Sequence, residues 1–198
     1  MTLERVILDG SMEEIGAHFS ALDPAAKLAA CRSLGPKQQR TLFAKAVASA
    51  PLTLEDFVGA QVAPLTEVIH EGRNTLPLFK LFQKRFCRPQ GRDDVLFGYN
   101  EGSTRALIGP GYFIARSTAG DGAMEEQGAI VVDYYDVPSG AVVAGWPQVI
   151  PNNQGLQRFV YNRTRDYMRA VAPGVTIGAA FKEGKPLGAY FVLCRQDP

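Results

Sequence analysis

The sequence has few of the residues that build metal and redox sites. Its 198 residues include two histidines and three cysteines, and the cysteines, at positions 31, 87 and 194, form no Cys-x-x-Cys pair. Structural zinc sites use four ligands at close spacings, and disulfide frameworks use an even, dense set of cysteines. We therefore expect no metal and no disulfide, as is typical of a protein from a reducing compartment.

The sequence also lacks a large excess of charge of one sign and any long apolar run. Its net charge is +1, whereas nucleic-acid-binding domains are usually strongly basic, so no nucleic-acid partner is expected. No run reaches the roughly 18 apolar residues of a transmembrane helix. The start, MTLERVILDG, has acidic residues and lacks the apolar core of a signal peptide. These absences predict a cytoplasmic protein without a transmembrane segment.

Several catalytic motifs are missing as well. There is no Gly-x-Ser-x-Gly elbow and no P-loop, and the glycine-rich segment GPGYF at 109–113 leads into a predicted strand rather than a helix. The segment HEGRN at 70–74 is not the zinc motif His-Glu-x-x-His. Because no nucleophile, metal cluster or cofactor motif is recognisable, we predict no cofactor and rank catalysis last among the functions considered.

What the chain does contain, before residue 60, is a series of helix signals. A capping box begins at Ser11, and Asp23 is an N-cap followed by a proline at the first helical position. Further helices are predicted from 36 to about 48 and from residue 53 onward. Such short helices are stable only when their apolar faces pack on each other or on a larger body.

The second half of the chain has the pattern of β-strands, in which β-branched and aromatic segments alternate with turn residues. The predicted strands are 95–99, 104–109, 112–117, 129–135, 175–181 and 188–195. One predicted helix, at 156–171, interrupts them. Helices first and antiparallel strands afterwards predict an α+β fold. A helical region at 1–90 would pack on an antiparallel sheet or small barrel of six or more strands at 91–198.

The segment LFKLFQKRF at 78–86 fits an amphipathic helix from about 76 to 86. Its phenylalanines fall on one apolar arc, and Arg85 falls inside that arc, where a charge needs a buried acceptor or a route to solvent. Three interpretations remain open. The helix is a core element on the sheet, it lies on a membrane surface, or it closes a cavity in which Arg85 meets an anionic ligand group.

An aspartate within the apolar segment AIVVDYY is a second candidate for a site. Alternation places Asp133 and Tyr135 on the same face of the strand. We favour a solvent-facing position, in which Asp133 has no special role. If the face is the inner one, the carboxylate needs a cationic partner, and Arg85, Arg105 and Arg116 are the candidates. An inner carboxylate would also be able to transfer a proton in an enzyme.

Two parts of the chain resemble a known family. The first is Lys84, Arg85 and Phe86, which end the segment LFKLFQKRF. The second is the terminal strand pair VTIGAAFKEGKPLGAYFVLCR, with Gly178 in one strand and Tyr190 to Arg195 in the other. Both resemble small bacterial GXWXG-type proteins, a family of unknown function, although the Gly-x-Trp-x-Gly motif itself is absent. The resemblance implies a compact, lipocalin-like β domain and carries no catalytic residue.

From these features we predict a binding module for a small apolar or lipid-like ligand with a polar or anionic end. The residues expected to line its site are Phe79, Phe82, Arg85, Phe86, Tyr112, Arg116, Asp133 and Tyr190. The alternative is a protein-interaction module, in which the N-terminal helices or a basic patch from 73–92 and 156–171 dock on another chain. An enzyme that uses Asp133 for proton transfer is the third alternative.

Overall fold

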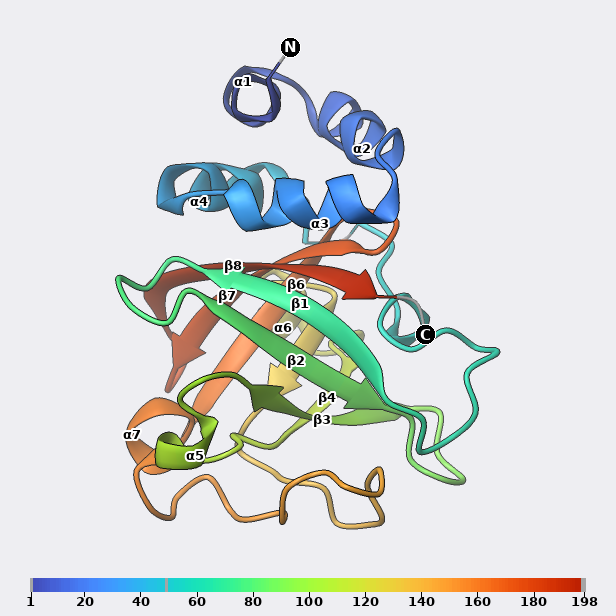
Figure 1. Ribbon diagram of the computed structural model, residues 1–198, viewed down its shortest axis with the longest axis vertical. Helices are drawn as coiled ribbons and strands as arrows, with labels where there is room; N and C mark the ends of the chain where they lie inside the picture. Colours follow the sequence, from blue (N-terminus) through green and yellow to red (C-terminus); the bar gives the residue numbers. More distant parts are fainter. Residues whose placement is uncertain (1, 49, 197–198) are drawn as a thin grey trace.

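The computed structural model describes residues 2–48 and 50–196. Helices α1 to α4 form a layer over one side of a closed barrel of eight antiparallel strands, as Figure 1 shows. The strands follow one another around the barrel in chain order, and β8 pairs with β1 to close it. The predicted α+β class, with helices first and an antiparallel, lipocalin-like barrel after them, is confirmed.

The helical layer is capped as the sequence predicts. It consists of α1 (Leu3–Asp9), α2 (Met12–Ser20), α3 (Pro24–Ser33) and α4 (Pro36–Lys45). The helix predicted from residue 53 onward is only a 3-10 turn at Leu54–Asp56. At the start of α2, the Ser11 hydroxyl accepts from the Glu14 N–H at 3.2 Å, and the Glu14 carboxylate accepts from the Ser11 N–H at 2.7 Å. At the start of α3, the Asp23 carboxylate accepts from the Ala26 N–H at 2.8 Å.

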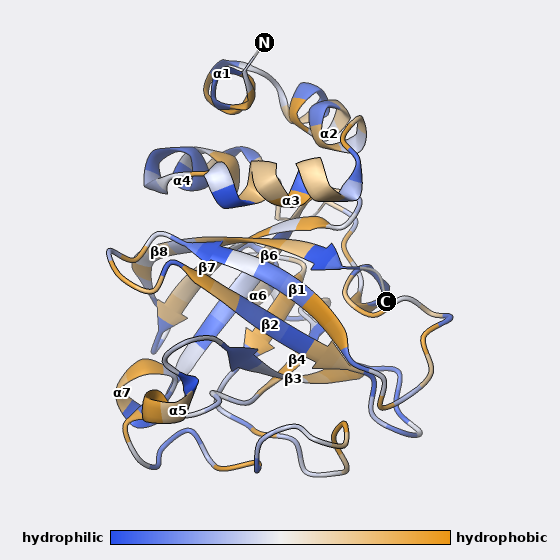
Figure 2. Cartoon of the chain, viewed as in Figure 1, coloured by the Kyte–Doolittle hydropathy of each residue, from blue (hydrophilic) through white to orange (hydrophobic). Residues whose placement is uncertain are grey.

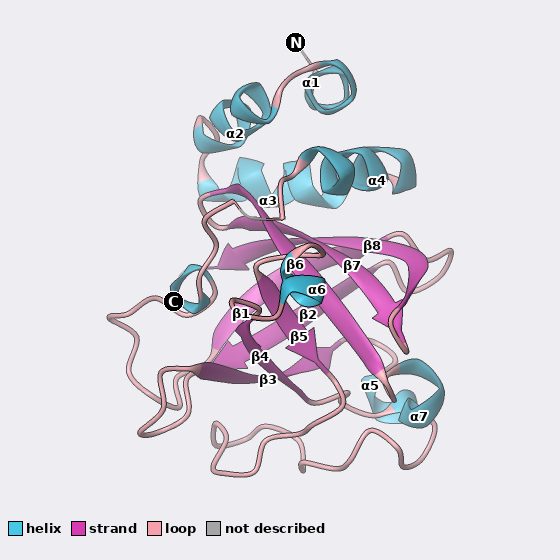
Figure 3. Ribbon diagram, turned by 180° about the vertical axis from the view of Figure 1, so that it is seen from behind, coloured by secondary structure: helices cyan, strands magenta, loops and turns pink. Residues whose placement is uncertain are grey.

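The barrel confirms most of the predicted strand positions. Its strands are β1 (Val68–Asn74), β2 (Leu81–Cys87), β3 (Val95–Glu101), β4 (Phe113–Ser117), β5 (Ile130–Asp133), β6 (Thr164–Ala172), β7 (Val175–Lys182) and β8 (Lys185–Gln196). Between them lie the short helices α5 (Arg105–Ile108), α6 (Gly122–Glu125) and α7 (Gln157–Val160). The strand predicted at 104–109 is wrong, because this segment winds into α5. Figure 2 shows the apolar α5 and α7 side by side at one end of the barrel, and Figure 3 shows the long loop from β5 to α7.

The helix predicted at 76–86 does not form, because this segment is the turn and second strand of a hairpin in which β1 and β2 pair antiparallel. Its apolar residues fit both the helical and the strand period. The segment forms a strand because it pairs with its neighbours in the barrel. Side chains alternate along a strand, so Phe82, Lys84 and Phe86 point into the barrel together. Two barrel strands thus lie within the region 1–90, which the sequence pattern predicts to be helical.

The prediction of a helix at 156–171 is also largely wrong. Only the short α7 is helical, and Arg163, which follows it, has a positive φ of 58°. From Thr164 the chain runs as β6, paired with β5 on one side and β7 on the other. Thr164 and Asp166 point into the barrel, whereas Arg165 and Arg169 point outward, toward Asp133 and the helical layer.

The helical layer packs on the outer face of β6, β7 and β8, where apolar residues from both sides form one buried cluster. Arg169 of β6 strengthens this contact. Its guanidinium donates to the backbone carbonyls of Phe43 at 2.9 Å and Ala46 at 3.0 Å, and it lies 4.0 Å from the centre of the Phe43 ring. The end of α4 is thereby fixed to the barrel wall.

Glycines on the inner face make room for phenylalanine rings inside the barrel. In three strand pairs a glycine lies directly opposite an inward phenylalanine, namely Gly72 with Phe82, Gly98 with Phe113 and Gly178 with Phe191. A Cβ atom on Gly178 would lie 2.8 Å from Sδ of Met168 and closer still to the Phe191 ring. Only glycine fits where a neighbouring ring approaches the backbone this closely, and the rings fill the middle of the barrel.

One end of the barrel is closed by residues 52–62. Phe57 and Val58 of this segment are fully buried in the same core as the barrel interior. Arg88 fixes the segment by donating to the carbonyl oxygens of Val58 at 2.8 Å and Val62 at 3.1 Å. The opposite end, at the tips of the β1–β2 and β7–β8 hairpins, is left open.

Candidate functional site

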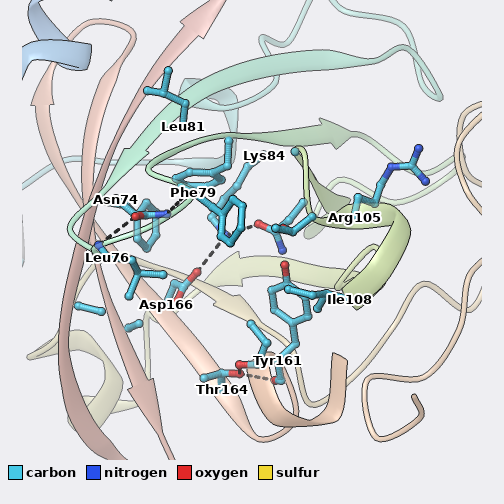
Figure 4. A pocket seen from close by; sticks show the side chains of 18 of the residues that line it. Asn74, Leu76, Phe79, Leu81, Lys84, Arg105, Ile108, Tyr161, Thr164 and Asp166 are labelled. Carbon is cyan, nitrogen blue, oxygen red and sulfur yellow. Dashed lines mark hydrogen bonds and ion pairs between the residues drawn. The ribbon is translucent and has the colours of Figure 1, made fainter. Parts of the chain in front are cut away.

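The open end of the barrel contains a pocket of about 370 Å³. Its walls come from the β1–β2 hairpin, α5, α7 and the ends of β6, β7 and β8 (Figure 4). Apolar side chains form most of the lining, among them Leu81, Phe82, Ile108 and Phe191. A pocket of this volume with apolar walls is typical of a site for a small molecule.

A buried lysine forms part of the pocket floor. Lys84 is only 2% exposed, and its ammonium has three acceptors: the Asp166 carboxylate at 3.0 Å, Oδ1 of Asn100 at 3.0 Å and the Tyr134 hydroxyl. The three N–H donors of the ammonium therefore meet three acceptors. A buried charge is tolerated only when it is paired and hydrogen-bonded in this way.

Aromatic rings surround the same ammonium. The ring centroids of Phe191, Phe113, Tyr134 and Phe82 lie 5.0, 5.1, 5.1 and 5.8 Å from its Nζ atom. Burial lowers the pKa of Lys84 below its usual value, and the charge of Asp166 opposes this effect. The rings add cation–π stabilisation of the charged form. The carboxylate and the rings together compensate the charge of Lys84 inside the barrel.

Tyr134 and Asn100 connect this ion pair to the rest of the barrel. The Tyr134 hydroxyl lies 3.2 Å from Oδ2 of Asp166, and the Asn100 amide donates to that hydroxyl at 3.1 Å and to the Gly111 carbonyl at 3.0 Å. Burial raises the pKa of Tyr134 well above its usual value, and the charge of Asp166 adds to this. The hydroxyl therefore stays protonated at neutral pH. We refer to Lys84, Asn100, Tyr134 and Asp166 as the polar floor.

Two polar atoms at the pocket have hydrogen-bonding capacity left over. Oδ1 of Asp166 accepts no hydrogen bond from a described residue, since Lys84 and Tyr134 both contact Oδ2. Tyr161, just after α7, stacks on Tyr134 at 5.3 Å and points into the pocket (Figure 4). Its hydroxyl likewise has no hydrogen-bond partner in the described part of the chain. Together the two side chains offer one acceptor and one donor to a bound molecule.

Three of the eight residues predicted to bind the ligand line this pocket: Phe79, Phe82 and Tyr190. Phe82 points inward from β2, and Phe79 lies in the β1–β2 turn, where it is 61% exposed. Tyr190 lines the pocket from β8, although its ring packs outward on Phe43 at 5.6 Å. The hairpin thus contributes two of the predicted aromatic residues, as a turn and a strand instead of a helix.

Arg85, Phe86 and Tyr112 lie elsewhere. Arg85 is on the outer face of β2 and pairs with Glu67 at 3.2 Å, so it does not meet the pocket. Phe86 points inward but lies deeper, in the core near the closed end. The Tyr112 hydroxyl donates to the Pro147 carbonyl, which places this ring under the long loop from β5 to α7.

Asp133 and Arg116 are both on the outer face of the barrel, and neither lines the pocket. Asp133 is buried there, because Arg165 and Arg116 donate to its carboxylate at 2.9 and 3.3 Å. The predicted alternation is correct, since Tyr134 points inward and Asp133 points outward. The favoured solvent-facing position is wrong, because the two arginines cover the Asp133 carboxylate. The proton-transfer hypothesis requires Asp133 in a cavity, and the structure places it on the opposite side of the strand from the pocket.

The polar floor is not evident from the sequence. A helical period places Lys84 on the solvent side, whereas the strand period places it between Phe82 and Phe86 on the inner face. That alternation, Phe-x-Lys-x-Phe, was the available signal in the sequence. Asp166 is predicted to point inward only if its segment is interpreted as a strand. Nothing in the sequence shows that Lys84 and Asp166 meet.

A second hollow, of about 740 Å³, lies on the surface beside Pro51, Leu52 and the connection from β4 to β5. Glu125 and Glu126 contribute to its lining, and no buried ion pair does. In the described part of the chain, no group of three His, Cys, Asp or Glu side chains is placed to hold a metal ion. No helix among residues 2–48 and 50–196 is long and apolar enough to cross a bilayer.

Comparisons of the chain with protein-family models, curated proteins and solved structures found no match. The resemblance to GXWXG-type proteins therefore stays a prediction from the sequence. The function of the pocket is inferred from its own geometry and charges.

Proposed function

We propose that this protein binds a small apolar molecule in the mouth of its barrel and holds a neutral polar group of that molecule against the polar floor. The observation that carries the proposal is one pocket of about 370 Å³ in which apolar walls end on the compensated pair of Lys84 and Asp166. A few polar groups at the bottom of an otherwise apolar pocket orient a ligand that the walls bind.

The charges of the polar floor favour a neutral group over an anion. Lys84 is already paired with Asp166. A carboxylate on the ligand would therefore lie beside the Asp166 carboxylate, and the polar floor has no unpaired cation to compensate its charge. A hydroxyl group can instead donate to Oδ1 of Asp166 and accept from the Tyr161 hydroxyl. The polar or anionic end expected from the sequence is thus narrowed to a neutral one, such as that of an alcohol.

The apolar part of the ligand would contact the walls. Burial of apolar surface contributes about 25 cal/mol per Å², and Phe79, Phe82 and Phe191 provide large ring surfaces. Arg85 and Asp133 have no part in this proposal because they lie on the outer face of the barrel.

A fluorescence titration with N-phenyl-1-naphthylamine, a neutral apolar probe, tests the proposal. The protein should bind one probe molecule, and 1-decanol should displace it. Ala180→Phe should abolish probe binding, because Ala180 lines the pocket directly opposite Asp166 in the strand register. Ala29→Phe adds the same ring on the exposed face of α3 and should leave binding unchanged. Probe binding that survives Ala180→Phe in a folded variant would refute the proposal.

Two other expectations remain predictions from the sequence. One is that the protein works in the cytoplasm. The other is the alternative function, in which the N-terminal helices or a basic patch dock on a protein partner.

A further inference from the structure

Exposed apolar side chains are concentrated around the mouth of the pocket. Of the eleven large apolar side chains that are exposed in the described part of the chain, nine belong to segments that line or flank this mouth. The most exposed are Leu107, Leu78, Phe159 and Phe79, at 73, 69, 65 and 61%. We call the exposed apolar residues of 76–81, α5, 156–160 and Leu187 the apolar rim.

The turn between β1 and β2 holds part of this rim out in solvent. The Asn74 side chain accepts from the Leu76 N–H at 3.0 Å and donates to the Phe79 carbonyl at 3.2 Å, which fixes the turn. Phe79 has a positive φ of 53°, an uncommon conformation for an aromatic residue. Exposed apolar side chains gathered around one opening are typical of a surface that binds another molecule or a membrane.

The segments around the mouth also carry an excess of positive charge. Six Lys or Arg and two Glu lie within residues 74–82, 101–109, 155–164 and 182–189, and Asp136 follows the open end of β5. The net charge of these segments together with Asp136 is +3, whereas the whole chain carries +1. Both glutamates form ion pairs with arginines of the same segments, at 2.8 and 2.9 Å. The cations left without a carboxylate partner among the described residues are Lys80, Arg158, Lys182 and Lys185.

We infer that the mouth of the barrel docks on an anionic lipid bilayer, with the apolar rim among the headgroups and the four unpaired cations on the lipid phosphates. Exposed apolar side chains flanked by cations are the features that bind such interfaces. The inference rests on the proposed function, because docking places the pocket opening against the lipid and lets an apolar ligand pass without crossing water. A second copy of the chain would bring like charges together, so charge complementarity favours the bilayer.

Sedimentation of the full chain with lipid vesicles tests the electrostatic part. Vesicles of equal parts phosphatidylcholine and phosphatidylglycerol should bind the protein at least tenfold more tightly than pure phosphatidylcholine, and high salt should release it. Lys80→Gln/Arg158→Gln should weaken binding roughly thirtyfold, since each cation near such a surface contributes about a factor of five. Lys37→Gln/Arg40→Gln removes the same charge from the exposed face of α4 and should bind like the wild type.

A second pair of variants tests the apolar part. Leu78→Ser/Phe79→Ser should weaken binding to the anionic vesicles at least tenfold, because two large apolar side chains lose their contact with lipid. Val47→Ser changes an exposed apolar residue outside the rim and should leave binding unchanged. Equal loss in the rim variant and in its control would overturn the inference.

The remaining outcomes separate docking from ligand binding. Absence of vesicle binding, with binding of N-phenyl-1-naphthylamine intact, would overturn the docking inference and leave the proposed function in place. Vesicle binding without probe binding would support docking and refute the proposed function. The wild type could also fail to bind vesicles and form a dimer that Leu78→Ser/Phe79→Ser converts to a monomer. This result would overturn the inference, because the rim would then mediate contacts between two copies of the chain. Native mass spectrometry measures the oligomeric state.

Discussion

Lys84 on β2 and Asp166 on β6 form a 3.0 Å ion pair across the interior of the barrel. The two strands are four positions apart in a closed order of eight, so they are opposite walls. The pair therefore spans the barrel between the core that fills the closed end and the pocket at the open end. It contributes both to the stability of the fold and to the floor of the site.

Removing one charge of this pair should destabilise the protein strongly. Lys84→Met leaves the Asp166 carboxylate buried without its cation, and the free energy of unfolding should fall by about 3–5 kcal/mol. Lys84→Met/Asp166→Leu removes both charges and should recover most of that loss. Urea denaturation followed by circular dichroism measures both. If the double variant is no more stable than the single variant, Lys84 and Asp166 do not compensate each other's charge.

The carboxylate of Asp133 should contribute to stability but not to binding. Asp133→Asn weakens the contacts with Arg165 and Arg116 on the outer face, and these arginines are partly exposed. The free energy of unfolding should fall by about 1–2 kcal/mol. The affinity for the neutral probe should not change, because Asp133 does not line the pocket. A loss of probe binding in a folded Asp133→Asn protein would contradict this assignment.

The pairing of glycine with phenylalanine inside the barrel should be sensitive to a single methyl group. Gly178→Ala places a Cβ atom against Phe191 and Met168, and such overpacking should cost about 1–3 kcal/mol of unfolding free energy. Gly122→Ala is the matched control, because a Cβ atom there meets nothing within 4 Å. Thermal denaturation should show a large decrease for the first variant and none for the second. Phe191→Leu in the Gly178→Ala background should restore part of the loss.

Alkaline pH should destabilise the fold through its buried phenols. Burial, with a contribution from Asp166, raises the pKa of Tyr161 to about 12, whereas an unfolded tyrosine ionises near 10. From pH 10 to 12 the unfolded state therefore loses a proton that the native state keeps, and stability falls. Relative to Tyr161→Phe, the wild type should lose roughly 1 kcal/mol between pH 8 and pH 11. If the free energies of unfolding of the wild type and of Tyr161→Phe, measured in urea, change with pH in parallel, the pKa of Tyr161 is not raised.

The capping signals and the terminal strands could be predicted because their causes are local. Ser11 with Glu14 and the proline after Asp23 determine helix starts within a few residues. The turn between β7 and β8 is a further local case, because Glu183 and Gly184 both have the positive φ that a tight hairpin requires.

The hairpin of β1 and β2 could not be predicted with the same reasoning, because its residues fit two periods. Phe82 and Phe86 lie on one side of a helix and also on one side of a strand, and only Lys84 distinguishes the two. A helical wheel places Lys84 in solvent, where a lysine is ordinary. Its burial depends on Asp166, which a distant segment brings to the opposite wall.

The polar floor should bind the neutral end of an apolar ligand in preference to an anionic one. The most direct test is displacement of N-phenyl-1-naphthylamine by 1-decanol and by decanoate, at neutral pH, from the wild type and from Asp166→Asn. The wild type should bind decanol at least tenfold more tightly, because decanoate would bury a charge that the floor does not compensate.

Asp166→Asn removes the carboxylate that pairs with Lys84. A ligand carboxylate can then take its place beside the lysine, so this variant should shift its preference toward decanoate. Asp133→Asn, which changes a carboxylate on the outer face, should keep the preference of the wild type. Two results would contradict a site for a neutral group at the polar floor: a wild-type protein that binds decanoate as tightly as decanol, or an Asp166→Asn variant with unchanged preference.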